Sequence, residues 1–154
     1  MSPRKAILAA VAAILIAAAA LAIGGWWSGE EAPGEDDPER IALGHTIYAT
    51  QCASCHGEAL EGQPDWRERL PSGKLPAPPH DETGHTWHHP DEQLFQITKH
   101  GVAAFAPEGY ESDMPGYAEA LTDEEIRAVL YFIKSSWPAE IRERQESLTE
   151  RSQQ

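Results

Sequence analysis

The pattern of apolar positions along this 154-residue chain predicts three helices separated by long loops. In the first predicted helix, residues 39–51, one face carries Ile41, Gly44, Ile47 and Tyr48 at helical spacing. Gly44 is the smallest residue on that face, so we expect another element to pack closely against it.

The other two helices are marked by signals at their ends. We predict a helix at residues 90–100, because Pro90 suits the first helical position and Gly101 suits a left-handed stop. The third helix has the clearest start, since Thr122 is followed three residues later by Glu125, as in a capping box. Its apolar stripe consists of Ile126, Val129, Leu130 and Ile133.

The segments between and after these helices are polar or rich in Gly and Pro. Residues 57–89 show no sustained periodicity, and a loop this long inside a compact domain predicts a functional role. Pro138 ends the third helix, and we expect residues 139–154 to form a polar C-terminal tail or a frayed helix. The pattern as a whole predicts an all-α fold for residues 39–138.

The amino terminus has the pattern of an export signal. Two basic residues precede an eighteen-residue apolar run, 6–23, and a tryptophan pair that suits a membrane interface follows it. The run reaches the lower length limit of a membrane span. We favour residues 1–27 as a retained signal/transmembrane anchor held by residues 6–27, with cleavage at Ala20–Ala22 as the alternative. Either outcome places the rest of the chain on the periplasmic side of the inner membrane.

The chain is strongly acidic, with a net charge of −13. Residues 28–38 are acidic and almost free of apolar side chains, which predicts a flexible linker. Residues 40–137 hold 15 acidic and seven basic residues. This balance argues against nucleic acid as a partner. The negative charge either attracts basic partners toward the protein or only keeps the protein soluble.

The only two cysteines lie three positions apart and are followed by a histidine. Cys52, Cys55 and His56 form Cys-x-x-Cys-His, the attachment signal of c-type haem. Two thiols on one helical turn can each bond a vinyl group, and the next residue then presents its imidazole to the iron. A zinc half-site lacks a second cysteine pair, and a thioredoxin-type redox pair lacks its β-rich context.

A second iron ligand is indicated by elimination. Met1 is the initiator, so Met114 is the one methionine available opposite His56. A thioether ligand stabilises ferrous iron and raises the reduction potential. His100 or a histidine of residues 85–89 is the competing ligand.

These features together resemble a class I cytochrome c of the bacterial mono-haem type, over residues 39–138. The matching elements are Gly44-x-x-x-Tyr48-x-x-x-Cys52-x-x-Cys55-His56-Gly57, Met114-Pro115 and the helical segment Leu121–Trp137. The resemblance implies a class I cytochrome c-like helical fold wrapped around one covalent haem c. It also implies that an aromatic side chain near Tyr131 packs on the first helix near Gly44.

The resemblance implies one further contact at the proximal histidine. In this family a proline carbonyl after the motif accepts the Nδ1–H of that histidine, which fixes the orientation of the ring. The segment Leu75–Pro79 is the expected place, with Pro78 preferred and Pro79 as the alternative.

The loop before the second helix is unusually rich in histidine. Its imidazoles belong to His80, His85, His88 and His89. Such a density can bind copper or zinc. The alternatives are that Trp87 covers the haem while one histidine bonds a propionate, or that exposed histidines have no role.

The function expected from these features is single-electron transfer rather than enzymatic catalysis. The expected redox partners are a quinol-oxidising complex and a terminal or copper oxidase. Two alternatives stay open: a haem enzyme or sensor with an open iron site, and a copper- or zinc-binding cytochrome that uses the cluster from His80 to His89.

Overall fold

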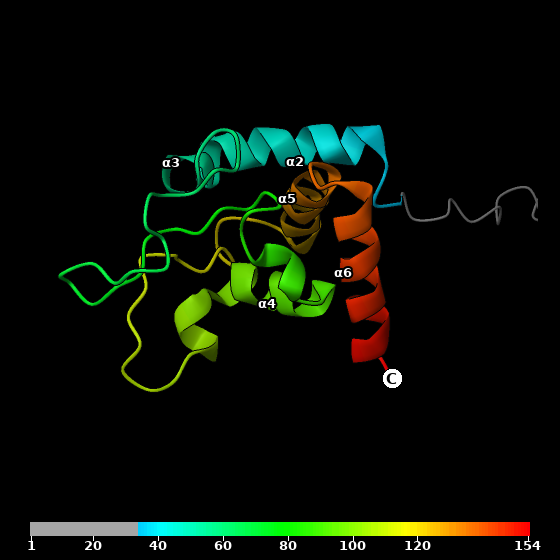
Figure 1. Cartoon of the computed structure of the whole chain (residues 1–154). Helices are drawn as coiled ribbons and strands as arrows, with labels where there is room; N and C mark the ends of the chain where they lie inside the picture. Colours follow the sequence, from blue (N-terminus) through cyan, green and yellow to red (C-terminus); the bar gives the residue numbers. More distant parts are fainter. Residues whose placement is uncertain (1–33) are drawn as a thin grey trace, which may run out of the picture. The chain divides into compact units, whose positions relative to one another are not determined.

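The computed structural model describes residues 34–154, and within this range the chain forms helices and loops but no β-strand. The longer helices are α2 (Pro38–Gln51), α4 (Asp91–His100), α5 (Asp123–Ser135) and α6 (Ala139–Ser152) (Figure 1). The short helical turns are α3 (Ala53–His56), η1 (Thr86–His88) and η2 (Val102–Phe105). The all-α fold class is confirmed.

Helices α2 and α5 pack against each other at Gly44. A Cβ atom added to this glycine would lie 1.9 Å from the carbonyl oxygen of Ala128 in α5. The aromatic side chain expected near Tyr131 is that of Phe132, whose ring lies 5.3 Å from the ring of Tyr48. The close approach predicted at Gly44 is therefore confirmed.

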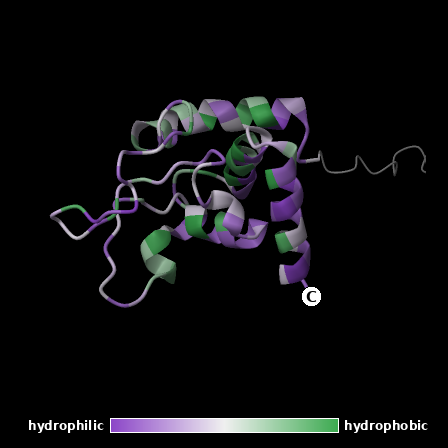
Figure 2. Cartoon of the chain, viewed as in Figure 1, coloured by the Kyte–Doolittle hydropathy of each residue, from purple (hydrophilic) through white to green (hydrophobic). Residues whose placement is uncertain are grey.

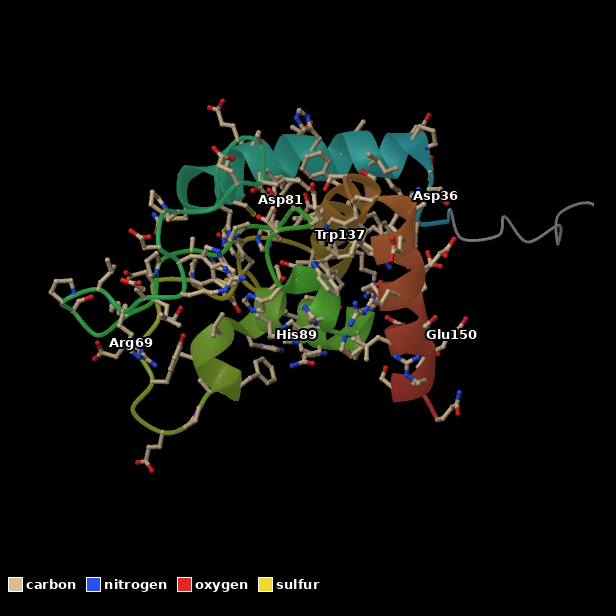
Figure 3. The ribbon with its side chains drawn as sticks, viewed as in Figure 1. Asp36, Arg69, Asp81, His89, Trp137 and Glu150 are labelled. Atoms are coloured by element: carbon tan, nitrogen blue, oxygen red, sulfur yellow. The ribbon has the colours of Figure 1, made fainter. Side chains whose placement is uncertain are left out.

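The core consists of two apolar clusters that share α5. The first joins α2, the loop after α3 and the end of α5, and its buried members are Ile47, Tyr48, Leu60, Val129, Ile133 and Trp137. The second joins α4 to α5, and its buried members are Leu94, Phe95, Ile126 and Leu130. Trp137, labelled in Figure 3, also donates its indole N–H to the carbonyl of His80 at 2.7 Å. Trp137, which follows α5, thus holds the histidine-rich loop as well as the core.

The helix ends follow most of the sequence signals. The predicted capping box is present, since the Thr122 hydroxyl accepts the Glu125 N–H at 3.2 Å and the Glu125 carboxylate accepts the Thr122 N–H at 2.8 Å. Gly101 ends α4 with φ of 82°, a backbone conformation open to glycine. Pro90 precedes α4 as its N-cap instead of occupying the first helical position.

Residues 139–152 form the regular helix α6. Of the two expectations for this segment, a helix is therefore present and the polar tail is wrong. The helix is largely hydrophilic in Figure 2 and therefore shows no apolar stripe in the sequence. Hydrogen bonds hold it in place instead. The fully buried Gln145 donates to the carbonyl of His89 at 3.1 Å and to the carboxylate of Asp91 at 2.7 Å.

An ion-pair network around the buried ammonium of Lys134 lies beside α6, and its two carboxylates are partly exposed. The ammonium of Lys134 lies 3.0 Å from the carboxylate of Asp91 and 2.5 Å from that of Glu35. Burial lowers the pKa of Lys134, but the two carboxylates outweigh burial and hold the pKa above its usual value. Glu35 falls within the predicted linker 28–38, so the end of that segment belongs to the folded unit Glu35–Gln154.

The predicted anchor at residues 6–27 lies outside the described residues, as does the alternative cleavage site at Ala20–Ala22. Across residues 34–154, every helix is too short or too polar to cross a membrane.

Candidate haem site

The Cys-x-x-Cys-His motif occupies a helical turn directly after α2. The Cys52 N–H donates to the carbonyl of Tyr48 at 2.9 Å, and the His56 N–H donates to the carbonyl of Cys52 at 2.9 Å. Both thiols are free, with Cys52 half-buried and Cys55 exposed. A single turn therefore presents two thiols and one imidazole, the chemistry that covalent haem attachment requires.

The electrostatics of Cys52 differ from those of a reactive redox cysteine. Burial and the neighbouring Cys55 raise the pKa of the Cys52 thiol to about 11. A reactive Cys-x-x-Cys pair needs a lowered pKa, which makes a thiolate at neutral pH. The thioredoxin-type alternative thus gains no support.

The imidazole of His56 is oriented by a backbone carbonyl. His56 is only 8% exposed, and its Nδ1 lies 2.8 Å from the carbonyl oxygen of Pro78. A carbonyl only accepts hydrogen bonds, so Nδ1 carries the proton and Nε2 keeps its lone pair in the neutral ring. The contact expected at Pro78 or Pro79 is present at Pro78.

The protonation state of His56 also suits a metal ligand. Burial lowers the pKa of His56, and the hydrogen bond to Pro78 offsets this only in part. The ring is therefore neutral at pH 7, the state in which an imidazole binds iron. The free thiols, the neutral ring and the fixed tautomer fit a covalently attached haem.

Two glycines allow the chain to pass close to the proline segment. A Cβ at Gly62 would lie 2.4 Å from the nitrogen of Pro79, and a Cβ at Gly84 would lie 2.0 Å from the carbonyl oxygen of Pro79. The Gly62 N–H also donates to the carbonyl of His56 at 2.7 Å. The loop after the motif therefore closes on Pro78 and Pro79 and fixes the acceptor that faces His56.

Met114 lies in the loop between η2 and α5 and is partly buried. Its N–H donates to the Ser112 hydroxyl at 3.1 Å, which fixes the local turn. Three residues later, the hydroxyl of Tyr117 donates to the carbonyl of Gln51 at 2.9 Å. Gln51 directly precedes the Cys-x-x-Cys-His motif, so this bond ties the methionine loop to it.

The histidines considered as other ligands make different contacts. His100 is exposed at the end of α4. The His85 ring stacks on Trp66 with centroids 5.3 Å apart, and the His88 ring stacks on Trp87 at 3.7 Å. Within residues 34–154, no three His, Cys, Asp or Glu side chains are grouped to hold a metal ion. The copper or zinc alternative has no preformed site in this part of the chain.

Trp87, predicted to cover the haem, lies in η1 between the core and α6. It packs against the first apolar cluster, and the guanidinium of Arg144 in α6 lies 5.0 Å from its ring. Its role toward a haem stays a prediction, as does the expected bond between a histidine and a propionate.

Sequence reasoning missed several residues that shape the site. The sequence pattern places Tyr48 on the apolar face of the first helix but indicates no role for its hydroxyl. In the structure this hydroxyl donates to the carbonyl of Gly57 at 2.9 Å and closes the turn. Tyr117 carries no local signal, because its partner Gln51 lies 66 positions away. The ring of His80 stacks on that of His56 with centroids 4.0 Å apart, a contact that the histidine count alone does not indicate.

Comparison with known proteins defines the class of protein. The family model for cytochrome c matches residues 41–137, more than half of the chain, and the chain therefore belongs to the cytochrome c family. With its helical fold, it is a class I c-type cytochrome. Membership implies covalently bound haem c and a role in electron transfer.

Among solved structures, the chain is similar to cytochrome CL from the marine methylotrophic bacterium Methylophaga aminisulfidivorans. The two are 24% identical with a TM-score of 0.48, and the match covers 71% of this chain and 63% of the other. This chain thus spans less than two thirds of the length of that protein. The curated proteins contain no match.

Proposed function

We propose that this protein is a one-electron carrier with a single haem, attached through Cys52 and Cys55, whose iron is bound by His56 and Met114. The observation that carries the proposal is the 2.8 Å contact between Nδ1 of His56 and the carbonyl of Pro78. It leaves the Nε2 lone pair of a buried, neutral imidazole on the same turn as two free thiols.

When bound, the haem supplies an iron that alternates between the ferric and ferrous states. The chain's own residues hold and orient it. The thiols of Cys52 and Cys55 anchor the porphyrin, and His56 is kept in one tautomer by Pro78. Tyr48 closes the motif turn through Gly57, so that the ligand and the thiols move little relative to each other.

The proposal of Met114 as the second ligand is supported by the position of its loop. Tyr117 bonds the end of α2, and its own N–H donates to the carbonyl of Thr98 in α4 at 3.1 Å. The loop is therefore fixed at two helices, one of which leads into the attachment motif. A fixed thioether lowers the energy of ferrous iron and raises the potential.

The proposed setting is the periplasmic side of the inner membrane, with residues 6–27 as an anchor. The support is the basic start of the chain and the apolar run after it. An acidic linker would let the domain meet partners in the same membrane at high effective concentration. We propose a quinol-oxidising complex as electron donor and a terminal or copper oxidase as acceptor.

The full chain purified from a host that attaches c-type haem tests the proposal. Mass spectrometry should show one haem per chain, and also whether the apolar run is retained. The ferric absorption spectrum should be low-spin with the band of methionine-to-iron charge transfer. High-spin iron would favour an enzyme or sensor with an open site, and a chain without haem would overturn the proposal.

A further inference from the structure

The ring of His80 lies face to face with the proposed proximal ligand. The centroids of the His80 and His56 imidazoles are 4.0 Å apart, and the ring planes differ by 20°. Rings in such contact limit each other's rotation, because any tilt of one face meets the other. Haem attachment through the motif does not require an aromatic ring against His56. The contact with His80 therefore has a separate function.

His80 is held at both its backbone and its side chain. Its N–H donates to the carbonyl of Leu60 at 2.8 Å, and its carbonyl accepts the indole N–H of Trp137 at 2.7 Å. Its Nδ1 lies 2.8 Å from the hydroxyl of the buried Thr86. Leu60 has φ of 67°, an uncommon conformation for leucine, and it is buried in the core. The surroundings thus fix the ring against His56.

The two neighbours of His56 restrain it in different directions. The carbonyl of Pro78 fixes the edge of the imidazole at Nδ1. A single hydrogen bond at an edge still allows the ring to tilt about the line through that bond. The His80 ring blocks this tilt, because it covers the face of the imidazole.

We propose that His80 is a positioning residue for the proximal ligand: its stacked ring, together with the carbonyl of Pro78, gives the plane of His56 a single orientation. This inference rests on the proposed function, because the orientation affects electron transfer only if His56 binds iron. In low-spin ferric haem, the orientations of the two axial ligands, including the plane of the imidazole, determine how unpaired spin is distributed over the haem methyl groups. Met114 is unchanged in every variant, so proton NMR reports a change in the plane of His56.

The test compares the haem methyl shifts of ferric variants of the full chain. His80→Leu removes the aromatic face, His80→Phe keeps a ring without the hydrogen bond, and Thr86→Val frees the His80 ring from its hydroxyl partner. The matched control is His85→Leu, which removes a ring of the same loop that stacks on Trp66 instead.

We expect His80→Leu to change the order and spread of the haem methyl shifts, and Thr86→Val to change them in the same direction but less. His80→Phe keeps the ring but also lacks the hydrogen bond to Thr86, so it should change the shifts no more than Thr86→Val does. His85→Leu should keep the pattern of the parent, even if its melting temperature falls. An unchanged pattern in His80→Leu would overturn the inference, as would a pattern in His80→Phe that matches His80→Leu.

If His80→Leu does not fold with its haem attached, Thr86→Val provides the test. Unchanged haem methyl shifts in Thr86→Val would overturn the inference, and changed shifts would support it. The parent protein separates this result from the proposed function. If the parent carries no covalent haem, both proposals are wrong. If the parent carries haem but the His80 variants have its haem methyl shifts, only the role proposed for His80 is wrong.

Discussion

The two ring nitrogens of His56 have different surroundings, and this difference gives each a separate role. Nδ1 donates to the carbonyl of Pro78, while burial keeps the ring neutral at pH 7. A neutral imidazole whose Nδ1–H is fixed offers only Nε2 to a metal. The same bond increases the basicity of the ligand, so one backbone carbonyl affects both the orientation and the donor strength of the proposed iron ligand.

Replacing Met114 with alanine tests the second ligand at the scale of one side chain. Met114→Ala should keep the haem attached, because Cys52 and Cys55 are untouched. The reduction potential should fall by on the order of 100 mV or more, a fraction of the ~0.8 V range that axial ligands span. Redox titration gives the potential. A variant with the potential of the parent would exclude Met114 as the ligand.

At the scale of elements, the contact between α2 and α5 depends on the absence of a side chain at Gly44. Helix propensity alone would favour alanine there by about 1 kcal/mol. The packing opposes this, because the added Cβ would lie 1.9 Å from a backbone oxygen of α5, which cannot move without its helix. The two effects therefore have opposite signs, and the measured stability decides which one is larger.

Gly44→Ala should lower the free energy of unfolding by about 2 kcal/mol or more, the usual cost of overpacking. Denaturant unfolding followed by circular dichroism measures it. Gly34→Ala is the matched control, because nothing lies within 4 Å of the added Cβ there, and its effect should be close to zero. A stabilised Gly44→Ala would show that helix propensity prevails and that the two helices are less closely packed.

The packing of α4, α5 and α6 against one another involves the ammonium of Lys134 in α5, whose side chain is 6% exposed. It pairs with Asp91 of α4, whose carboxylate also accepts a hydrogen bond from Gln145 of α6. Lys134→Met keeps most of the volume but leaves the carboxylate of Asp91 without its cation. The expected loss of stability is about 2 kcal/mol, below the range for a fully buried pair because Asp91 is partly exposed. Lys99→Met is the control, since its partner Asp123 is 62% exposed and the pair should contribute less than about 1 kcal/mol.

The stability that Lys134 contributes has a definite dependence on pH. The pKa of Lys134 is raised in the folded state, so its contribution is fully present below the usual lysine pKa of about 10.4 and is lost as pH rises through the raised value. The difference in unfolding free energy between the parent and Lys134→Met should therefore be constant from neutral pH to about pH 9 and should narrow above the usual lysine pKa. A difference that already narrows between neutral pH and pH 9 would contradict this account.

On the scale of the whole molecule, the net charge of −13 should control its encounters with small redox reagents. A negative protein attracts cations and repels anions, and salt screens both effects, with a Debye length of about 10 Å at 0.1 M. Oxidation of the reduced protein by a cationic cobalt complex should slow as salt is added, while oxidation by ferricyanide should accelerate. Stopped-flow kinetics measures both rates. Salt effects of the same sign would mean that net charge does not steer these reactions.

Much of the site is local in sequence and could be predicted without a structure. The spacing of Cys52, Cys55 and His56 places them on one helical turn, whatever the remainder of the chain does. Thr122 and Glu125 likewise cap a helix through contacts only three residues apart. The choice of Met114 followed from counting methionines, and its ligation stays a prediction.

The parts that could not be predicted involve groups that carry no sequence signal. Gln145 holds the polar helix α6 against the segment from His89 to Asp91 through hydrogen bonds, so no apolar stripe in the sequence indicates this helix. Tyr117 reaches a backbone carbonyl 66 positions away, and every residue has such a carbonyl. The stack of His80 on His56 arises because the loop folds back over the motif, which the composition of the loop does not specify.

The sequence by itself thus determined which residues can bond a haem, since that chemistry depends on side-chain identity and on spacing within one turn. Only the tertiary structure decided which of two prolines faces His56 and which histidine covers its ring. Pro78 lies 22 positions from His56, and their contact depends on a loop that closes through Gly62 and Gly84. Long-range contacts, such as those of the His56 ring with a backbone carbonyl and with another ring, depend on how the whole chain packs, and local patterns do not encode them.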